Sequence, residues 1–176
     1  MNGKADLTPS ENKWDWLANG IYFWEQNPTR ALEYAVESAL GKQRNKVQIQ
    51  TPFVIGAIVE LGICLNLIEP NSLGIVKEAY KGLSATYKQS GEQLPKNKGN
   101  NRALDCAVIK FLHQTRSAQG LPAYDSIRCA FTEGEELYEG SNFSSRLHIQ
   151  VCLINNDLIK GYFLPRPIAA FNPYLD

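Results

Sequence analysis

The spacing of apolar and polar residues along the chain predicts a mixture of helices and strands. Apolar residues at helical spacing predict three helices, which begin near Asn27, Asn71 and Arg102. Alternating or continuous apolar runs predict strands at residues 21–24, 52–59, 126–131, 147–154 and 158–164. Because strands flank a middle pair of helices, the order fits an α+β domain rather than a regular βαβ alternation.

The stretch from Trp14 to Leu40 contains all the tryptophans of the chain, which are Trp14, Trp16 and Trp24. Asn19-Gly20 is a turn signal before the first strand, and Asn27 is a good N-cap for the helix that follows. The aromatic rings gathered at this strand could stack on a flat ligand or form a corner of the core. For an arbitrary sequence the usual burial of aromatic residues favours the core.

Segments between and after these elements give further predictions. The nearly continuous apolar run 52–59 predicts a strand that is covered on both faces, and Gly62–Glu69 leaves it as a loop or short extension. Residues 91–101 form the most polar loop and the best candidate for mobility. Three prolines after Leu164 predict an irregular tail.

Composition and charge narrow the class of protein. With 176 residues, the chain is expected to form one domain over residues 1–176. Lys+Arg and Asp+Glu are both 18, so no excess of positive charge indicates a nucleic-acid or membrane-surface partner. The four cysteines form no C-x-x-C pair, which gives no sign of a metal site. The N-terminus lacks the apolar region of a signal peptide, and no apolar run is long enough to span a membrane, so we expect a cytoplasmic protein.

Polar residues inside predicted strands are the candidates for a site. His148 and Gln150 share one face of the strand 147–154 and need either hydrogen-bond partners or a cleft. A solvated sheet face explains them equally well. Arg128 could bind an anionic ligand or pair with an acid such as Glu133, and pairing is the commoner outcome. No phosphate-binding glycine loop and no zinc-protease motif occurs.

The run SENKWDWLANGIYFWEQNPTRALEYA resembles the DUF3990-like family of bacterial ADP-ribosyltransferase-like proteins. In that family, a loop of the form S-x-N-x-x-D/W precedes G-x-Y-F/L-x, and a helix with a run like R-A-L-E-x-A follows. The similarity continues through PFVIGAIVELG, RALDCAVIKFLH, YDSIRCAFTEGEELY and HIQVC, so it covers nearly the whole chain. The first block is fairly specific, whereas the later blocks add order and spacing.

The resemblance implies an ADP-ribosyltransferase-like fold of the PARP branch, in which a split, strongly bent β-sheet with flanking helices clasps NAD. Tyr22 matches the position whose ring stacks on nicotinamide. The residues expected to bind NAD with it are Ser10, Asn12, Gly20, Trp24 and Arg128. His148 and Gln150 lie at the late-strand position that often carries a catalytic Glu.

The chain departs from the family pattern in two ways. The family's first strand, with its His that holds the adenosine ribose, is expected upstream of Gly3, so we expect a domain that lacks this strand. Such a chain would bind NAD weakly, and an exposed sheet edge would favour self-association. The second departure is the absent Glu, because a carboxylate normally stabilises the oxocarbenium-like transition state.

The function that the resemblance implies is NAD-dependent mono-ADP-ribosyl transfer by a bacterial toxin or defence effector. The acceptor would be a protein or a nucleic acid, and an antitoxin is a further expected partner. A second reading is a catalytically inactive fold that binds a nucleotide or a protein, and a third is a plain NAD hydrolase.

Overall fold

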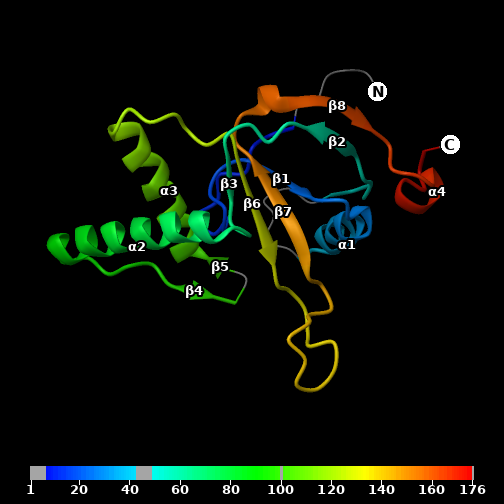
Figure 1. Cartoon of the computed structure of the whole chain (residues 1–176). Coiled ribbons are helices and arrows are strands. Elements are labelled where there is room, and N and C mark those ends of the chain that lie inside the picture. The colour runs from blue at the N-terminus through cyan, green and yellow to red at the C-terminus, as the bar shows by residue number, and fades with distance from the viewer. Residues whose placement is uncertain (1–6, 43–48, 100, 176) are drawn as a thin grey trace. The chain divides into compact units, whose positions relative to one another are not determined.

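A computed structural model describes residues 7–42, 49–99 and 101–175. The elements in chain order (Figure 1) are β1 (Ile21–Trp24), α1 (Pro28–Ala39), β2 (Gly56–Val59), β3 (Cys64–Asn66), α2 (Pro70–Ser90), β4 (Asn97–Lys98), β5 (Asn101–Arg102), α3 (Ala103–Ala118), β6 (Ser126–Phe131), β7 (His148–Leu153), the 3-10 turn η1 (Asn156–Leu158), β8 (Ile159–Phe163) and α4 (Ile168–Phe171). One sheet has the strand order β1-β7-β6-β3, while β2 pairs with β8 and β4 with β5. The chain is therefore of the α+β class, as the sequence predicts.

The contacts divide the chain into two compact units. The first unit comprises residues 1–22, 61–130 and 151–156, and the second comprises residues 23–60, 131–150 and 157–176. Strands β1, β6 and β7 run from one unit into the other. The single domain expected from chain length stays a prediction.

The core of the first unit forms around helices α2 and α3. Helix α2 ends at Gly91, whose left-handed φ of 72° suits glycine as a C-cap. The side chain of Asn97 caps α3, because its Oδ1 accepts hydrogen bonds from the amides of Leu104 (2.9 Å) and Asp105 (3.3 Å). The buried residues of this core are Leu17, Ala18, Leu65, Ala79, Leu83, Cys106, Val108, Ile109, Leu112, Tyr124, Ile127 and Cys152.

The second unit contains α1, α4 and the β2–β8 pair. Asn27 caps α1 as predicted, since its Oδ1 accepts from the Arg30 amide at 3.0 Å. The buried side chain of Asn172 accepts a hydrogen bond from the Val54 amide at 2.9 Å. This bond anchors the segment before β2 to the C-terminal segment of the same unit.

The prediction that residues 52–59 form a strand covered on both faces is wrong. Only Gly56–Val59 is a strand, and it pairs with β8 in a two-stranded sheet. Phe53 and Ile58 are 52% and 60% exposed. An apolar run fixes β-propensity but not the number of layers that pack on it, so burial depended on neighbours that the pattern could not specify.

Several short elements escape the sequence pattern. Cys64–Asn66 lies in the segment expected as a loop or short extension, yet it forms β3, parallel to β6 with Leu65 opposite Ile127. The β4–β5 pair lies in and next to the expected polar loop, and α4 lies in the tail expected to be irregular. Each of these elements is only two to four residues long, which is too short to show a period.

The backbone of Gly20, one of the residues expected to bind NAD, lies very close to strand β7. A Cβ at this position would lie 2.5 Å from the Cys152 sulfur and 2.7 Å from the Leu153 carbonyl oxygen. We expect Gly20→Ala to lower the free energy of unfolding by about 1–3 kcal/mol, because the backbone must shift to relieve the overlap. Urea denaturation measures the change.

The matched control is Gly74→Ala in α2, where an added Cβ meets no atom within 4 Å. Alanine in a helix interior should stabilise the chain by about 0.5–1 kcal/mol. Equal effects of the two alanines would show that the approach at Gly20 is not tight.

Candidate functional site

Three of the residues expected to bind NAD lie together in the first unit, where a short loop is closed on itself. The backbones of Ser10 and Gly20 exchange two hydrogen bonds, of 2.8 and 3.1 Å. Inside the loop, the Asp15 carboxylate accepts from the Ser10 hydroxyl at 2.7 Å and from the Asn12 amide at 2.8 Å. The polar side chains of this loop are therefore bonded to one another.

Tyr22 belongs to the same arrangement. Its hydroxyl donates to the Ala18 carbonyl oxygen at 2.7 Å and accepts from the Leu17 amide at 3.1 Å. Its ring packs against the core of the first unit, and burial raises the pKa of the hydroxyl far above its ordinary value of 10.0. Tyr22 is thus a partly buried, neutral side chain that ties β1 to the loop before it.

Arg128 belongs to the same unit as this loop, whereas Trp24 belongs to the second unit. Whether Trp24 binds one NAD molecule together with Tyr22 and Asn12, as the resemblance implies, therefore stays a prediction. Arg128 stands on β6 opposite Asn66 of β3, and its guanidinium lies 3.4 Å from the Asn66 side-chain oxygen.

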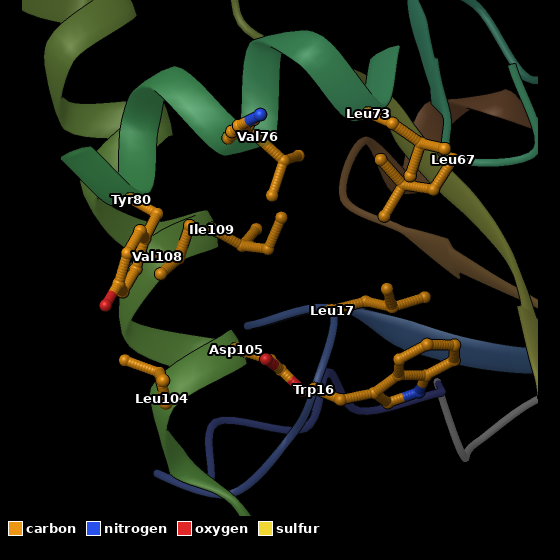
Figure 2. A pocket seen from close by; sticks show the side chains of 11 residues that line it. Trp16, Leu17, Leu67, Leu73, Val76, Tyr80, Leu104, Asp105, Val108 and Ile109 are labelled. Carbon is orange, nitrogen blue, oxygen red and sulfur yellow. The ribbon is translucent and has the colours of Figure 1, made fainter. Parts of the chain in front are cut away.

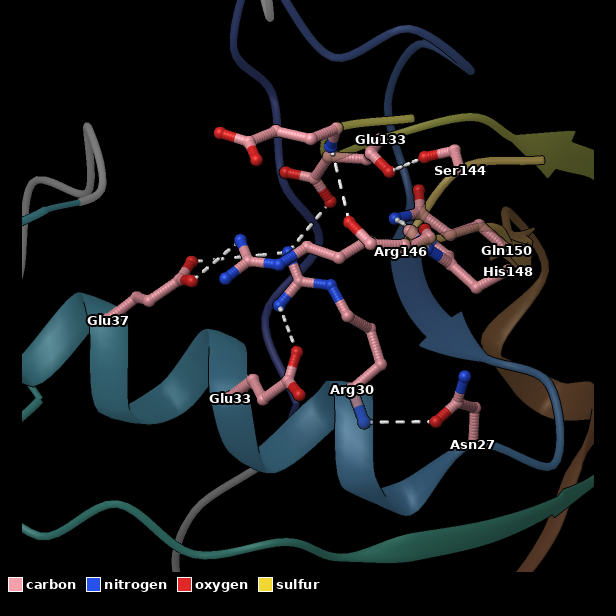
Figure 3. Close-up of polar contacts among 11 residues, drawn as sticks. Asn27, Arg30, Glu33, Glu37, Glu133, Ser144, Arg146, His148 and Gln150 are labelled. Atoms are coloured by element: carbon pink, nitrogen blue, oxygen red, sulfur yellow. Dashed lines mark hydrogen bonds and ion pairs between the residues drawn. The ribbon is translucent and has the colours of Figure 1, made fainter. Parts of the chain in front are cut away.

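The second unit holds the other two candidates, His148 and Gln150, as neighbours on one face of β7 (Figure 3). The Nδ1 atom of His148 lies 2.7 Å from the Arg146 carbonyl oxygen, which can only accept, so Nδ1 carries the hydrogen. The Nε2 atom lies 3.0 Å from the amide nitrogen of Gln150 and accepts from it. This assignment from the hydrogen-bond network gives a neutral imidazole.

Aromatic rings surround the His148 imidazole. The Phe131 ring centroid lies 5.4 Å away and that of Trp24 6.5 Å away, both tilted, and Trp24 also contacts Tyr34 at 5.0 Å. The pKa of His148 is lowered chiefly by burial; its hydrogen bond to Arg146 opposes the shift, and the smaller effects of Arg30 and Glu133 have opposite signs. Protonation would also place a donor at Nε2 against the Gln150 amide hydrogens.

A cluster of charged residues lies in the same unit as these rings (Figure 3). The Arg30 side chain, only 5% exposed, forms an ion pair with Glu133 at 2.7 Å and lies within 4.0 Å of Glu33 and Glu37. Arg146 pairs with Glu37 at 2.8 Å. The Ser144 hydroxyl donates to the Glu133 carbonyl oxygen and holds the loop after β6 in place.

This charge cluster is the part of the site that sequence reasoning missed. Glu133 was weighed as a partner for Arg128, whereas it pairs with Arg30, 103 positions away. The available signal was the spacing of Arg30, Glu33 and Glu37 on one stripe of a helix. That spacing indicates a charged face, but it does not reveal that Arg30 on this face is buried.

The titration of His148 gives a testable dependence of stability on pH. Because its folded pKa lies below the ordinary value of 6.5, the unfolded chain binds the proton more readily. The stability contributed by neutral His148 is therefore complete above pH 6.5 and is lost as the pH falls below it. We expect the free energy of unfolding, measured by denaturant titration, to decrease from pH 7.5 to 5.5.

His148→Gln should reduce this decrease. His113 should contribute in the same direction, since burial also lowers its pKa and its ring packs edge-on against Tyr124 in the first unit. Each single variant should lose part of the pH dependence, and the double variant should lose more than either. A decrease unchanged in His148→Gln would contradict the neutral assignment.

Comparison with known proteins identifies no relative of this chain. No family model matches the chain, and neither a characterised protein nor a solved structure matches it. Within residues 7–42, 49–99 and 101–175, no helix has the length and apolar character needed to cross a membrane. The fold and the candidate site therefore rest on the residues of this chain alone.

Proposed function

We propose that the chain is an NAD-dependent mono-ADP-ribosyltransferase, of the toxin or defence-effector kind, that modifies a protein or nucleic-acid acceptor. The observation that carries the proposal is the grouping of His148 and Gln150 with two aromatic rings in the unit that also holds Glu133. Flat apolar rings suit a nicotinamide or adenine ring, and neighbouring amide and imidazole groups suit ribose hydroxyls. The proposal also rests on the family resemblance of residues 10–35.

The reaction defines what the residues must do. The bond between C1 of the nicotinamide ribose and the nicotinamide nitrogen breaks, and its electron pair leaves with nicotinamide. The sugar develops positive charge in an oxocarbenium-like transition state. An acceptor nucleophile then forms a bond to C1 and loses its proton. A fixed negative charge near the sugar lowers the barrier, because it interacts more strongly with the transition state than with the substrate.

Glu133 is our candidate for this negative charge. Its side chain is 15% exposed and is oriented by the ion pair with Arg30. Gln150 would bond a ribose hydroxyl, and neutral His148 would hold the Gln150 amide in position through the 3.0 Å contact. These assignments supply the carboxylate that the late-strand position itself lacks.

Buried donors in the same unit fit a polar ligand. The Trp24 indole nitrogen is buried and has no hydrogen-bond partner among the described residues, and the same holds for Nε of Arg30. A buried donor without an acceptor destabilises the folded state by about 1–3 kcal/mol. Oxygen atoms of a bound nucleotide are acceptors of the required kind, which supports binding here.

A second candidate function is nucleotide binding without catalysis. The observation that favours it is the neutralisation of Glu133 by Arg30, since a paired carboxylate presents less negative charge to a sugar. The two candidates differ in bond cleavage, so one assay separates them. Purified full-length chain is incubated with NAD, with and without cell protein and nucleic acid as acceptors, and free nicotinamide and acceptor-bound ADP-ribose are quantified.

The transferase predicts nicotinamide release that is accompanied by equal labelling of an acceptor. Release without labelling would instead identify an NAD hydrolase. Calorimetric binding of NAD without any release would establish the inactive binder. Absence of both release and binding would refute every function of this kind.

The role of Glu133 gives the sharpest prediction for activity. Glu133→Gln keeps the shape of the side chain but removes its charge, so we expect nicotinamide release to slow by roughly 10²–10³-fold. The matched control is Glu135→Gln in the same loop, an exposed position that should keep wild-type kcat. Equal rates for the two variants, measured at a temperature where both are folded, would exclude Glu133 from the reaction.

A further inference from the structure

The first unit contains an apolar pocket that the proposed reaction does not use. The pocket has a volume of about 420 Å³ and lies between α2, α3 and the segment Trp16–Leu17 (Figure 2). Small-molecule sites commonly measure about 300–1,000 Å³ and are lined by apolar and aromatic side chains. The size and lining of this pocket therefore suit a small organic molecule.

The pocket has a buried floor and an exposed apolar rim. Leu17, Val108 and Ile109 of the lining are almost wholly buried. Leu73 and Tyr80 of α2 are 51% and 42% exposed and line the same pocket. An apolar ligand would cover them and release the water that they now contact. The indole of Trp16 adds a flat surface of the kind that stacks on a planar ring.

The charge of the lining favours a cation over an anion. Only Asp105 and Lys77 carry charge among the lining residues. The Asp105 side chain leaves α3 toward Trp16 (Figure 2), is half-buried, and has no hydrogen bond or ion pair with the described residues through its carboxylate. Lys77 is exposed on α2, where water screens its charge.

Two backbone amides near Asp105 are already occupied and do not offer a site to an anion. The first-turn amides of Leu104 and Asp105 already donate to the Asn97 side chain, at 2.9 and 3.3 Å. An anionic group would thus meet a carboxylate beside amides that are occupied. A cationic group would instead gain a charge-assisted bond to Asp105.

From these features we infer that the pocket binds a small planar aromatic molecule that carries one positively charged amine. The ring lies on the apolar floor between α2 and α3, and the ammonium group binds Asp105. This inference is independent of the proposed transferase, since it concerns residues of the first unit alone.

Three probes with one ring and different charge test the inference by isothermal titration calorimetry of the full chain. Tryptamine carries an ammonium group, tryptophol a neutral hydroxyl and indole-3-propionate a carboxylate. We expect tryptamine to bind about tenfold more tightly than tryptophol, because a hydrogen bond to a charged group stabilises more than a neutral one. Indole-3-propionate should bind most weakly of the three.

Asp105→Asn separates the charge from the shape of the pocket. This variant should bind tryptamine and tryptophol equally, and tryptophol should bind it as it binds the wild type. The control Glu92→Gln removes an exposed carboxylate outside the pocket and should keep the tenfold preference. The inference is overturned if no probe gives saturable binding, if the anion binds best, or if the preference for tryptamine survives in Asp105→Asn.

Discussion

The burial of the Arg30 guanidinium is the constraint around which the second unit is arranged. A buried charge without a partner is strongly destabilising, so this cation requires carboxylates within a few ångströms. Glu133 supplies one from the loop after β6, and Glu37 supplies another from α1 itself. Glu37 also pairs with Arg146, two residues before His148. A helix and both ends of the β6–β7 connection are thereby joined by one set of charges.

The two groups of candidate residues differ in how their polar atoms are satisfied. In the first unit, the side chains of Ser10, Asn12 and Tyr22 form hydrogen bonds with other groups of residues 10–22. These bonds satisfy the polar side chains of the loop without a ligand. In the second unit, Trp24 and Arg30 have buried donors for which the described residues provide no acceptor. Natural proteins satisfy most buried polar groups. Among the candidate residues, the unsatisfied donor of Trp24 therefore favours a ligand beside Trp24 over one in the loop 10–22.

Local patterns predicted the elements, while contacts distant in sequence determined the site. Asn27 and Pro28 define the start of α1 through contacts within one helical turn, so this start can be predicted from the local sequence. The alternation in β7 placed His148 and Gln150 on one face correctly, but alternation cannot say what packs on that face. The pairing of Arg30 with Glu133 joins residues 103 positions apart, so no local period could reveal it.

A double-mutant cycle tests most directly whether this ion pair organises the second unit. Arg30→Met and Glu133→Gln, made singly and together, are compared with the wild type by denaturant titration, and the coupling energy is the departure from additivity. We expect a favourable coupling of roughly 1–3 kcal/mol, because each single variant leaves a buried group without its partner. Additive effects of the two substitutions would contradict it, since they would mean that Glu133 takes its position without Arg30.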